Sequence, residues 1–250
     1  MKPILTPALL LWSFLPALGL IPMAHADEPL KTRLEARAKE SAAKTPEATK
    51  TAYAAGIKAV EQSGVVKAAK QVGEQAPDFV LANAQGKPTA LRDLLKQGPV
   101  VLTWYRGGWC PYCNLTLQAL QKVLPDIHAA GAQLVALTPE LPDKTAETTG
   151  KNGLHFEVLT DLNHAAAKDY GLIFRLTPEV RDLYRKHFDL SEFNGPGAGI
   201  DQLPLAATYI IGQDGVIRYA FLHADYRERA EPSALVSFIK ENKTLLTTQP

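Results

Sequence analysis

Apolar and polar positions along the chain form runs of two kinds. From residue 79 onward, short blocks of apolar and β-branched residues, typical of buried strands, alternate with segments where apolar residues recur every three or four positions, as in amphipathic helices. The predicted strands are residues 79–81, 99–104, 133–138, 156–160, 207–211 and 216–221, and the predicted helices are residues 91–95, 115–123, 163–170, 178–187 and a terminal helix that starts at Glu231-Pro232.

The order of these elements predicts the fold class. The last two strands flank Gln213-Asp214-Gly215, a strong turn signal for an antiparallel hairpin. Residues 172–203 form an insertion before this hairpin, with the predicted helix 178–187 and a Gly-Pro-Gly loop at residues 195–197. Pro125 is expected to bend or end the helix before it. The pattern therefore predicts an α/β fold with a central mixed β-sheet and helices on both faces.

The first part of the chain has a different composition. Residues 27–75 are rich in Ala, Lys and Glu, and apolar positions at helical spacing on both sides of Pro46 predict two amphipathic helices. These helices would pack on the domain or on another subunit, or they would form a mobile tail. We therefore divide the mature chain into an N-terminal helical extension, residues 27–71, and a domain, residues 72–245.

Residues 1–26 have the order of parts found in a secretory signal peptide. Lys2 precedes a mostly apolar run, and Ala24-His25-Ala26 places small residues where a signal peptidase reads them. Cleavage after Ala26 would yield a periplasmic or secreted protein without stable membrane insertion, because no later run is apolar enough to cross a bilayer. The alternative is an uncleaved N-terminal membrane anchor, since the apolar run approaches the length that spans a bilayer.

Charge and length narrow the choice of partners. The full chain has 27 basic and 26 acidic residues, and Lys2 is the only charged residue of the predicted signal peptide, so the mature chain is balanced. A balanced chain does not favour nucleic acid or an anionic membrane surface as a partner. The length suits one domain with an extension, which can bury a core without disulfide staples.

The chain contains two cysteines, Cys110 and Cys113, between the predicted strand 99–104 and the helix after it. Pro111 suits the first turn of that helix, so Cys110 would stand at its N-terminus. Backbone N–H groups and the helix dipole favour an anion there, and we therefore expect a low pKa for the Cys110 thiol. Cys113 follows one turn later on the same side, so the pair can cycle between dithiol and disulfide.

Two other interpretations of the cysteines are weaker. A zinc site needs four ligands, but the histidines are scattered and no second cysteine pair is present, so we expect no metal and no bound cofactor. A purely structural disulfide across two residues would close a loop too short to constrain the unfolded chain much.

The motifs between Val72 and Lys240 occur in the order of one known family. They are Gly73-x-x-Ala76-Pro77-Asp78-Phe79, the strand and loop before the cysteines, Val158-Leu159-Thr160-Asp161, Tyr170-Gly171, and Tyr209-Ile210-Ile211 before Asp214-Gly215. On these residues the chain resembles the alkyl hydroperoxide reductase and thiol-specific antioxidant family, the peroxiredoxins of the thioredoxin-like superfamily. Segments 106–113 and 225–232 are similar to the peroxiredoxin-like branch with a Cys-x-x-Cys motif. The resemblance implies a thioredoxin-like fold and a thiol-dependent peroxidase.

The chain departs from the peroxiredoxin pattern at the residues that activate peroxide. By the family's spacing, the peroxidatic cysteine falls at Cys113, the threonine at Cys110, the proline at Arg106 and a later arginine at Ala206. In thioredoxins that last place holds a proline, and Pro204 lies two residues away from it.

Cleavage of the O–O bond requires groups that stabilise charge on the leaving oxygen. Arg106 and Arg229 are the candidates to replace the missing residues, and the alternative for both is an ordinary surface salt bridge. Trp109 would cover the disulfide, or it would serve packing alone. The predicted catalytic set is therefore Arg106, Cys110, Cys113 and Arg229, with Cys110 and Cys113 as the redox disulfide.

Three functions fit these residues. The first is an antioxidant thiol peroxidase that reduces hydrogen or organic peroxides through a sulfenic acid. The second is a periplasmic thiol-disulfide oxidoreductase in which an exposed Cys110 attacks a protein disulfide. The third is a binding module whose thiols are incidental. Either enzyme needs a thiol reductant, thioredoxin-like or membrane-linked, that the sequence does not identify, and a homodimer stays open.

Overall fold

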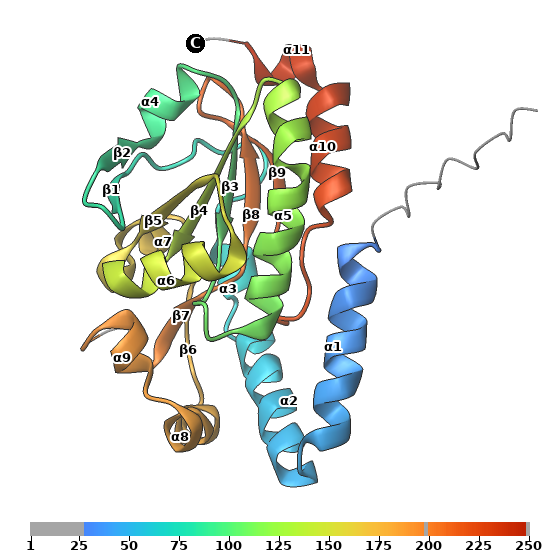
Figure 1. Cartoon of the computed structure of the whole chain (residues 1–250), viewed down its shortest axis with the longest axis vertical. Coiled ribbons are helices and arrows are strands. Elements are labelled where there is room, and N and C mark those ends of the chain that lie inside the picture. Colours follow the sequence, from blue (N-terminus) through green and yellow to red (C-terminus); the bar gives the residue numbers. More distant parts are fainter. Residues whose placement is uncertain (1–27, 198–199, 249–250) are drawn as a thin grey trace, which may run out of the picture.

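The computed structural model describes residues 28–197 and 200–248, so the predicted signal peptide, residues 1–26, lies outside the described residues. Seven strands form one sheet in the order β2-β1-β5-β4-β3-β8-β9 (Figure 1). β3, β4 and β5 are parallel, and the other neighbours are antiparallel, which confirms the predicted mixed sheet. The strands are β1 (Val80–Asn83), β2 (Pro88–Ala90), β3 (Val100–Trp104), β4 (Gln133–Thr138), β5 (Glu157–Thr160), β8 (Thr208–Ile211) and β9 (Ile217–Phe221).

Helices cover both faces of this sheet and enclose two apolar cores. Side chains alternate between the faces along β3, so Val101 lies in one core while Val100 and Leu102 lie in the other. The first core contains α1 (Leu30–Lys44), α5 (Pro111–Ala129), α10 (Pro232–Glu241) and α11 (Lys243–Leu246), and the second contains α2 (Glu47–Gln62), α3 (Val65–Ala68), α4 (Leu91–Leu95), α7 (Ala165–Asp169) and α8 (Pro178–His187).

Both predicted N-terminal helices are present on either side of Pro46, and both pack on the rest of the chain. α1 lies against α5, and α2 lies against α8. Pro29, which precedes α1, supplies no side-chain cap, but the carboxylate of Glu231 accepts hydrogen bonds from the backbone N–H groups of Leu30 and Lys31. The extension is thus tied to the start of α10, while the domain boundary at residue 72 stays a prediction.

The insertion has the predicted extent but contains more elements than its sequence pattern indicated. Its two strands, β6 (Ile173–Arg175) and β7 (Gln202–Pro204), form a separate antiparallel sheet. Between them lie α8, which matches the predicted helix 178–187, and α9 (Leu190–Asn194). The predicted helix 163–170 corresponds to a short 3-10 helix, η1 (Leu162–His164), followed by α7, whereas α6 (Pro142–Asn152) was not indicated by the periodicity.

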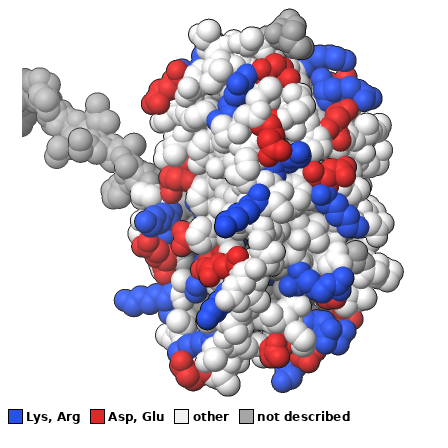
Figure 2. All heavy atoms as spheres, turned by 180° about the vertical axis from the view of Figure 1, so that it is seen from behind, with Lys and Arg blue, Asp and Glu red and all other residues white. Residues whose placement is uncertain are grey.

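Pro125 does not end α5, which continues to Ala129. The residue is exposed, and the helix therefore loses one hydrogen bond at its solvent face without exposing the core. Over the described residues, no helix combines the length and hydropathy that a membrane span requires. On the face drawn in Figure 2, basic and acidic side chains are interspersed, as the balanced composition implies.

Candidate active site

The loop between β3 and α5 carries the two cysteines, and two adjacent glycines shape it. Gly107 has φ of 146°, and a Cβ atom there would lie 2.1 Å from the indole nitrogen of Trp109. A Cβ on Gly108 would lie 2.1 Å from Oγ1 of Thr148 in α6. The glycine pair therefore lets Trp109 and α6 close against the loop from two sides.

Cys110 is the residue before the first turn of α5, as predicted, and Cys113 lies one turn into the helix. Both are free thiols. Cys110 is 2% exposed and Cys113 is 0% exposed, so the expectation of an exposed Cys110 is wrong. The two side chains are hydrogen-bonded to each other.

The two thiols have opposite pKa shifts. Burial and the hydrogen bond to Cys113 raise the pKa of Cys110 well above its ordinary value. Burial also acts on Cys113, but the hydrogen bond from Cys110 and the charges of Arg229 and Arg106 outweigh it and lower its pKa to about 5. The prediction of a low pKa for Cys110 is therefore wrong, because burial and the interaction with Cys113 outweigh the charges of Arg106 and Arg229. Cys113 is the thiolate of the pair.

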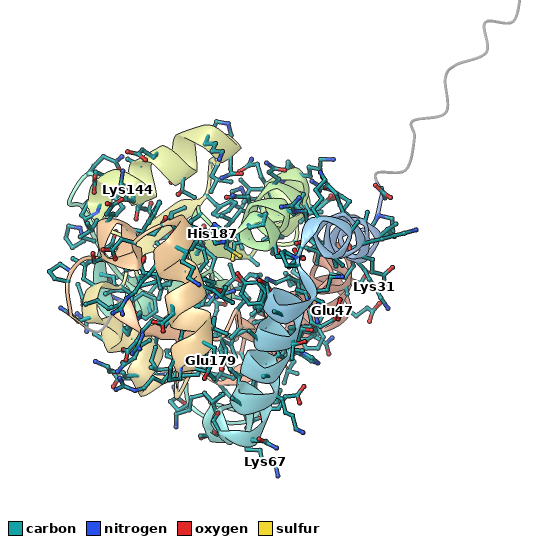
Figure 3. The ribbon with its side chains drawn as sticks, turned by 90° about the horizontal axis from the view of Figure 1, so that it is seen from below. Lys31, Glu47, Lys67, Lys144, Glu179 and His187 are labelled. Atoms are coloured by element: carbon teal, nitrogen blue, oxygen red, sulfur yellow. The ribbon has the colours of Figure 1, made fainter. Side chains whose placement is uncertain are left out.

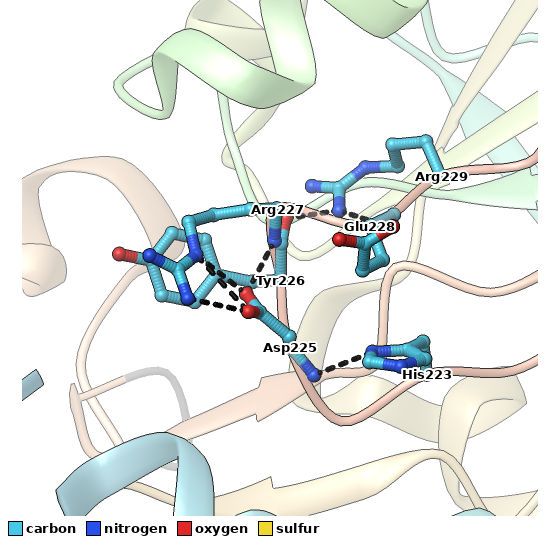
Figure 4. Close-up of polar contacts among 6 residues, drawn as sticks. All are labelled: His223, Asp225, Tyr226, Arg227, Glu228 and Arg229. Carbon is cyan, nitrogen blue, oxygen red and sulfur yellow. Dashed lines mark hydrogen bonds and ion pairs between the residues drawn. The ribbon is translucent and has the colours of Figure 1, made fainter. Parts of the chain in front are cut away.

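Arg229 reaches Cys113 from the segment between β9 and α10. Its Nη2 atom lies 3.5 Å from Sγ of Cys113. Its Nη1 atom donates to the backbone carbonyls of Tyr226 and Glu228, which fix the guanidinium (Figure 4). In the same segment Arg227 pairs with the carboxylate of Asp225, which neutralises its charge.

Arg106 lies on the other side of the cysteines and is 2% exposed. Its backbone N–H is hydrogen-bonded to the sulfur of Cys113. Its Nη2 atom donates to the hydroxyl of Tyr184, 2.5 Å away. Aromatic rings surround the guanidinium, with the ring centres of Tyr226 and Trp109 at 4.5 and 5.0 Å. The alternative that Arg106 is an ordinary surface salt-bridge residue is therefore wrong.

The fold thus brings together Arg106, Cys110, Cys113 and Arg229, the four residues singled out in the sequence. Ala206, which takes the place of the family's later arginine, is buried just before β8. Pro204 ends β7 in the separate small sheet.

Glu140 is a site residue that the sequence pattern did not reveal. It is 1% exposed, and its carboxylate accepts hydrogen bonds from Tyr105 Oη (3.0 Å), the Gly108 N–H (2.8 Å) and Thr148 Oγ1 (3.1 Å). Burial, with a contribution from the charge of Cys113, raises its pKa to about 7 despite these hydrogen bonds. One sequence signal could have identified Glu140. It comes just after β4, and because β3 and β4 are parallel, their ends meet at the same edge of the sheet, where β3 leads to the cysteines.

The site chemistry is that of a buried thiolate between two cations with a titratable carboxyl group nearby. Within residues 28–197 and 200–248, no group of three or more His, Cys, Asp or Glu side chains is arranged to hold a metal ion. The arrangement can deliver a sulfur nucleophile and can stabilise negative charge on a small reacting group.

Part of the chain matches a known protein family and several curated proteins. The model of the AhpC/TSA family matches residues 72–220. The thiol-disulfide oxidoreductase ResA of Bacillus thuringiensis (strain Al Hakam) is 28% identical over 103 residues, which cover 41% of this chain and 58% of that protein. The putative peroxiredoxin bcp of Haemophilus influenzae is 30% identical over 101 residues, covering 40% and 64%. The matches thus span about three fifths of the length of these curated relatives.

Solved structures show the same fold at low sequence identity. The peroxidoxin BcpB from Mycobacterium tuberculosis has a TM-score of 0.54 at 17% identity, covering 71% of this chain and 99% of that one. A cysteine-to-serine mutant of the peroxiredoxin 6 of Arenicola marina has a TM-score of 0.54 at 18% identity, covering 70% and 74%. The predicted thioredoxin-like fold is therefore confirmed.

Proposed function

Because the chain belongs to the AhpC/TSA family, we propose that it is a peroxiredoxin-like antioxidant thiol oxidoreductase that reduces hydrogen or organic peroxides through Cys110 and Cys113. One observation carries the proposal: the low-pKa sulfur of Cys113 lies 3.5 Å from the guanidinium of Arg229. A thiolate is the form of cysteine that attacks peroxide, and a neighbouring cation stabilises charge on the leaving oxygen.

The reaction proceeds in two steps. The Cys113 thiolate attacks one oxygen of the peroxide and forms an S–O bond as the O–O bond breaks. The leaving oxygen departs as hydroxide or alkoxide near Arg229 and takes up a proton, giving water or an alcohol. The Cys110 thiol then attacks the Cys113 sulfenic acid, releasing water and leaving a disulfide. An external thiol donor must return the two electrons.

Burial favours a peroxide over a protein disulfide as substrate. Neither Cys110 nor Cys113 is exposed by more than 2%, and a protein disulfide must bring its own sulfur into line with the attacking thiolate. A hydroperoxide group is close to two water molecules in size and needs a much smaller opening. The matches to ResA proteins keep thiol-disulfide exchange as the second candidate.

The proposed location is outside the cytoplasm, periplasmic or secreted, and it depends on the signal-like residues 1–26. In that compartment the reductant would be a thioredoxin-like or membrane-linked thiol donor. A homodimer is compatible with this proposal.

The decisive experiment follows oxidation of the reduced mature chain, residues 27–250, by hydrogen peroxide and by cumene hydroperoxide at pH 7 through Trp fluorescence. We expect oxidation orders of magnitude faster than that of free cysteine. Cys110→Ser should retain one turnover and yield a dimedone-reactive sulfenic acid, while Cys113→Ser should lose the reaction. Oxidation no faster than that of free cysteine, together with reduction of insulin disulfides, would instead establish the thiol-disulfide oxidoreductase.

A further inference from the structure

The loop between β3 and α5 contains two adjacent glycines, Gly107 and Gly108. Glycine restrains the backbone less than any other residue, so such a loop depends on outside contacts to fix its conformation. Its position matters for the nucleophile, because the backbone N–H of Arg106 in this loop is hydrogen-bonded to the sulfur of Cys113. Groups that hold the loop therefore also hold a hydrogen-bond donor at the sulfur.

Two side chains from different elements bind both backbone groups of Gly108. The Nδ2 atom of Asn114, near the start of α5, donates to the carbonyl oxygen of Gly108 at 2.7 Å. The carboxylate of Glu140, just after β4, accepts the N–H of Gly108 at 2.8 Å. We call these two contacts the Gly108 clamp. Next to it, the N–H of Cys110 donates to the carbonyl of Gly107, which closes the turn before α5.

The amide of Asn114 is oriented by its neighbours on two helices. In the view from below, α5 lies between α6, which is marked by Lys144, and α1, which is marked by Lys31 (Figure 3). Asn152 of α6 donates to Oδ1 of Asn114 at 3.0 Å, and Gln118 of α5 donates to Oδ1 of Asn152 at 3.0 Å. Because its oxygen accepts from α6, the nitrogen of the Asn114 amide faces the loop.

The clamp is independent of the redox state of the cysteines. A thiolate is a strong hydrogen-bond acceptor and a disulfide sulfur is a weak one, so the contact between Arg106 and Cys113 weakens on oxidation. Asn114 and Glu140 bind the backbone of Gly108 instead, and no sulfur takes part in these two hydrogen bonds. The loop can thus keep its place until reduction restores the thiolate.

We propose that Asn114 and Glu140 are positioning residues for the Cys113 nucleophile, and that they act through Gly108 by holding the Arg106 N–H against the sulfur. The inference rests on the proposed function, in which Cys113 is the attacking thiolate. A donor that is already in place stabilises the thiolate without rearrangement during the reaction. Loss of the clamp therefore destabilises the thiolate itself and not only the fold.

The first test is Asn114→Ala in the Cys110→Ser background, where Cys113 is the single thiol. Thiolate absorbance at 240 nm as a function of pH should show the pKa of Cys113 raised by about one unit. Gln121→Ala is the matched control, because this amide of α5 accepts a backbone N–H from His155, away from the loop, and the pKa should change by less than about 0.3 unit. An unchanged pKa in folded Asn114→Ala, or equal shifts in the two variants, would overturn the proposal.

The disulfide equilibrium with glutathione gives a second measurement, in the chain with both cysteines. Asn114→Ala should make the disulfide about tenfold harder to reduce at pH 7, because only the reduced form loses thiolate stabilisation. An equilibrium equal to that of the wild-type chain would contradict a role in positioning the thiolate.

Glu140→Gln and Glu140→Ala test the other half of the clamp. Both side chains are uncharged, but the amide oxygen of Gln can still accept the N–H of Gly108. The pKa of Cys113 should be about half a unit or more higher in the Ala variant than in the Gln variant, and equal values would remove Glu140 from the proposal. This pair also decides the question if Asn114→Ala fails to fold, and thermal unfolding checks every variant.

None of these measurements involves peroxide. A Cys113 pKa that responds to the clamp, in a protein that does not reduce peroxide, would overturn the proposed function alone. Rapid peroxide reduction with a Cys113 pKa that is unchanged in Asn114→Ala would overturn this inference alone.

Discussion

Arg229 and Cys113 lie 116 positions apart in the chain, yet the guanidinium nitrogen Nη2 and the sulfur are 3.5 Å from each other. The family pattern has an arginine just before the strand of Tyr209, where this chain has Ala206. Here the cation comes instead from the segment between β9 and α10, on the far side of the hairpin. The positive charge next to the sulfur is thus supplied by a different segment of the fold.

Replacing Arg229 with Ala should raise the pKa of Cys113 by roughly one to two units, because an adjacent positive charge is lost. Oxidation by hydrogen peroxide at pH 7 should slow by about tenfold or more, since the thiolate population and the charge stabilisation both fall. Thiolate absorbance at 240 nm as a function of pH, with stopped-flow oxidation, measures both effects. Arg227→Ala is the matched control, because that guanidinium is held by Asp225 (Figure 4). Equal effects of the two substitutions would refute a specific role for Arg229.

The hydrogen bond between the cysteines gives a second prediction. Cys110→Ser keeps a donor beside Cys113 and should leave the pKa of Cys113 low, whereas Cys110→Ala removes the donor and should raise that pKa by about one unit. Iodoacetamide alkylation rates across pH 4 to 9 report the pKa in both variants, each of which has one thiol. A pKa in Cys110→Ala as low as in Cys110→Ser would show that the arginines alone set it.

The raised pKa of Glu140 predicts a specific pH dependence of the stability of the protein. Its pKa is about 7 in the folded protein and near 4.5 in the unfolded chain, so the folded state binds the proton more tightly. Stability should therefore decrease as pH rises from about 4.5 to 7, by up to about 3 kcal/mol, and the loss is complete above pH 7. Glu140→Gln cannot ionise, and its unfolding free energy should lack this component.

Urea unfolding of the reduced protein at pH 5 and pH 8 measures the effect as a difference between the wild-type chain and Glu140→Gln. Glu147→Gln, at an exposed position of α6, is the control and should follow the wild-type pH dependence. If Glu140→Gln followed it as well, Glu140 would not be the group responsible.

The close approach of α6 to the cysteine loop predicts a sharp difference between two glycines. Gly108→Ala should destabilise the protein by about 2 kcal/mol, because its Cβ would lie 2.1 Å from Oγ1 of Thr148. Gly150→Ala, within α6, meets no heavy atom within 4 Å and should be neutral or slightly stabilising. Urea unfolding gives both values, and the double variant Gly108→Ala/Thr148→Ala should recover part of the loss. Equal stability of the two single variants would contradict the packing argument.

Strong periodicity made much of the fold predictable from the sequence. The helix 178–187 and the strand 133–138 match α8 and β4, because each has a clear apolar pattern between turn residues. α6 gave no such pattern, since the side chains it buries are the threonines Thr145 and Thr148. β6 and β7 have three residues each, too few to display a period of two.

The candidate site was predictable in its members but not in its electrostatics. Local spacing identified Cys110 and Cys113, and the family pattern directed attention to Arg106 and Arg229. The pKa order of the two thiols depends on their burial and on the charge of Arg229, which lies 116 positions from Cys113, and no local pattern encodes these contacts. Glu140 was missed for the same reason, because its hydrogen-bond partners come from two other segments, the loop between β3 and α5 and the helix α6.

The cap on α1 has a consequence for the timing of folding during synthesis. The N–H groups that begin this helix are bonded to Glu231, 201 positions later than Leu30, and the helix packs on α5. A chain made or exported from its N-terminus would hold α1 without its cap until Glu231 emerges. The first helix of the described residues is therefore among the last to be completed, and its cap comes from the same segment that carries Arg229.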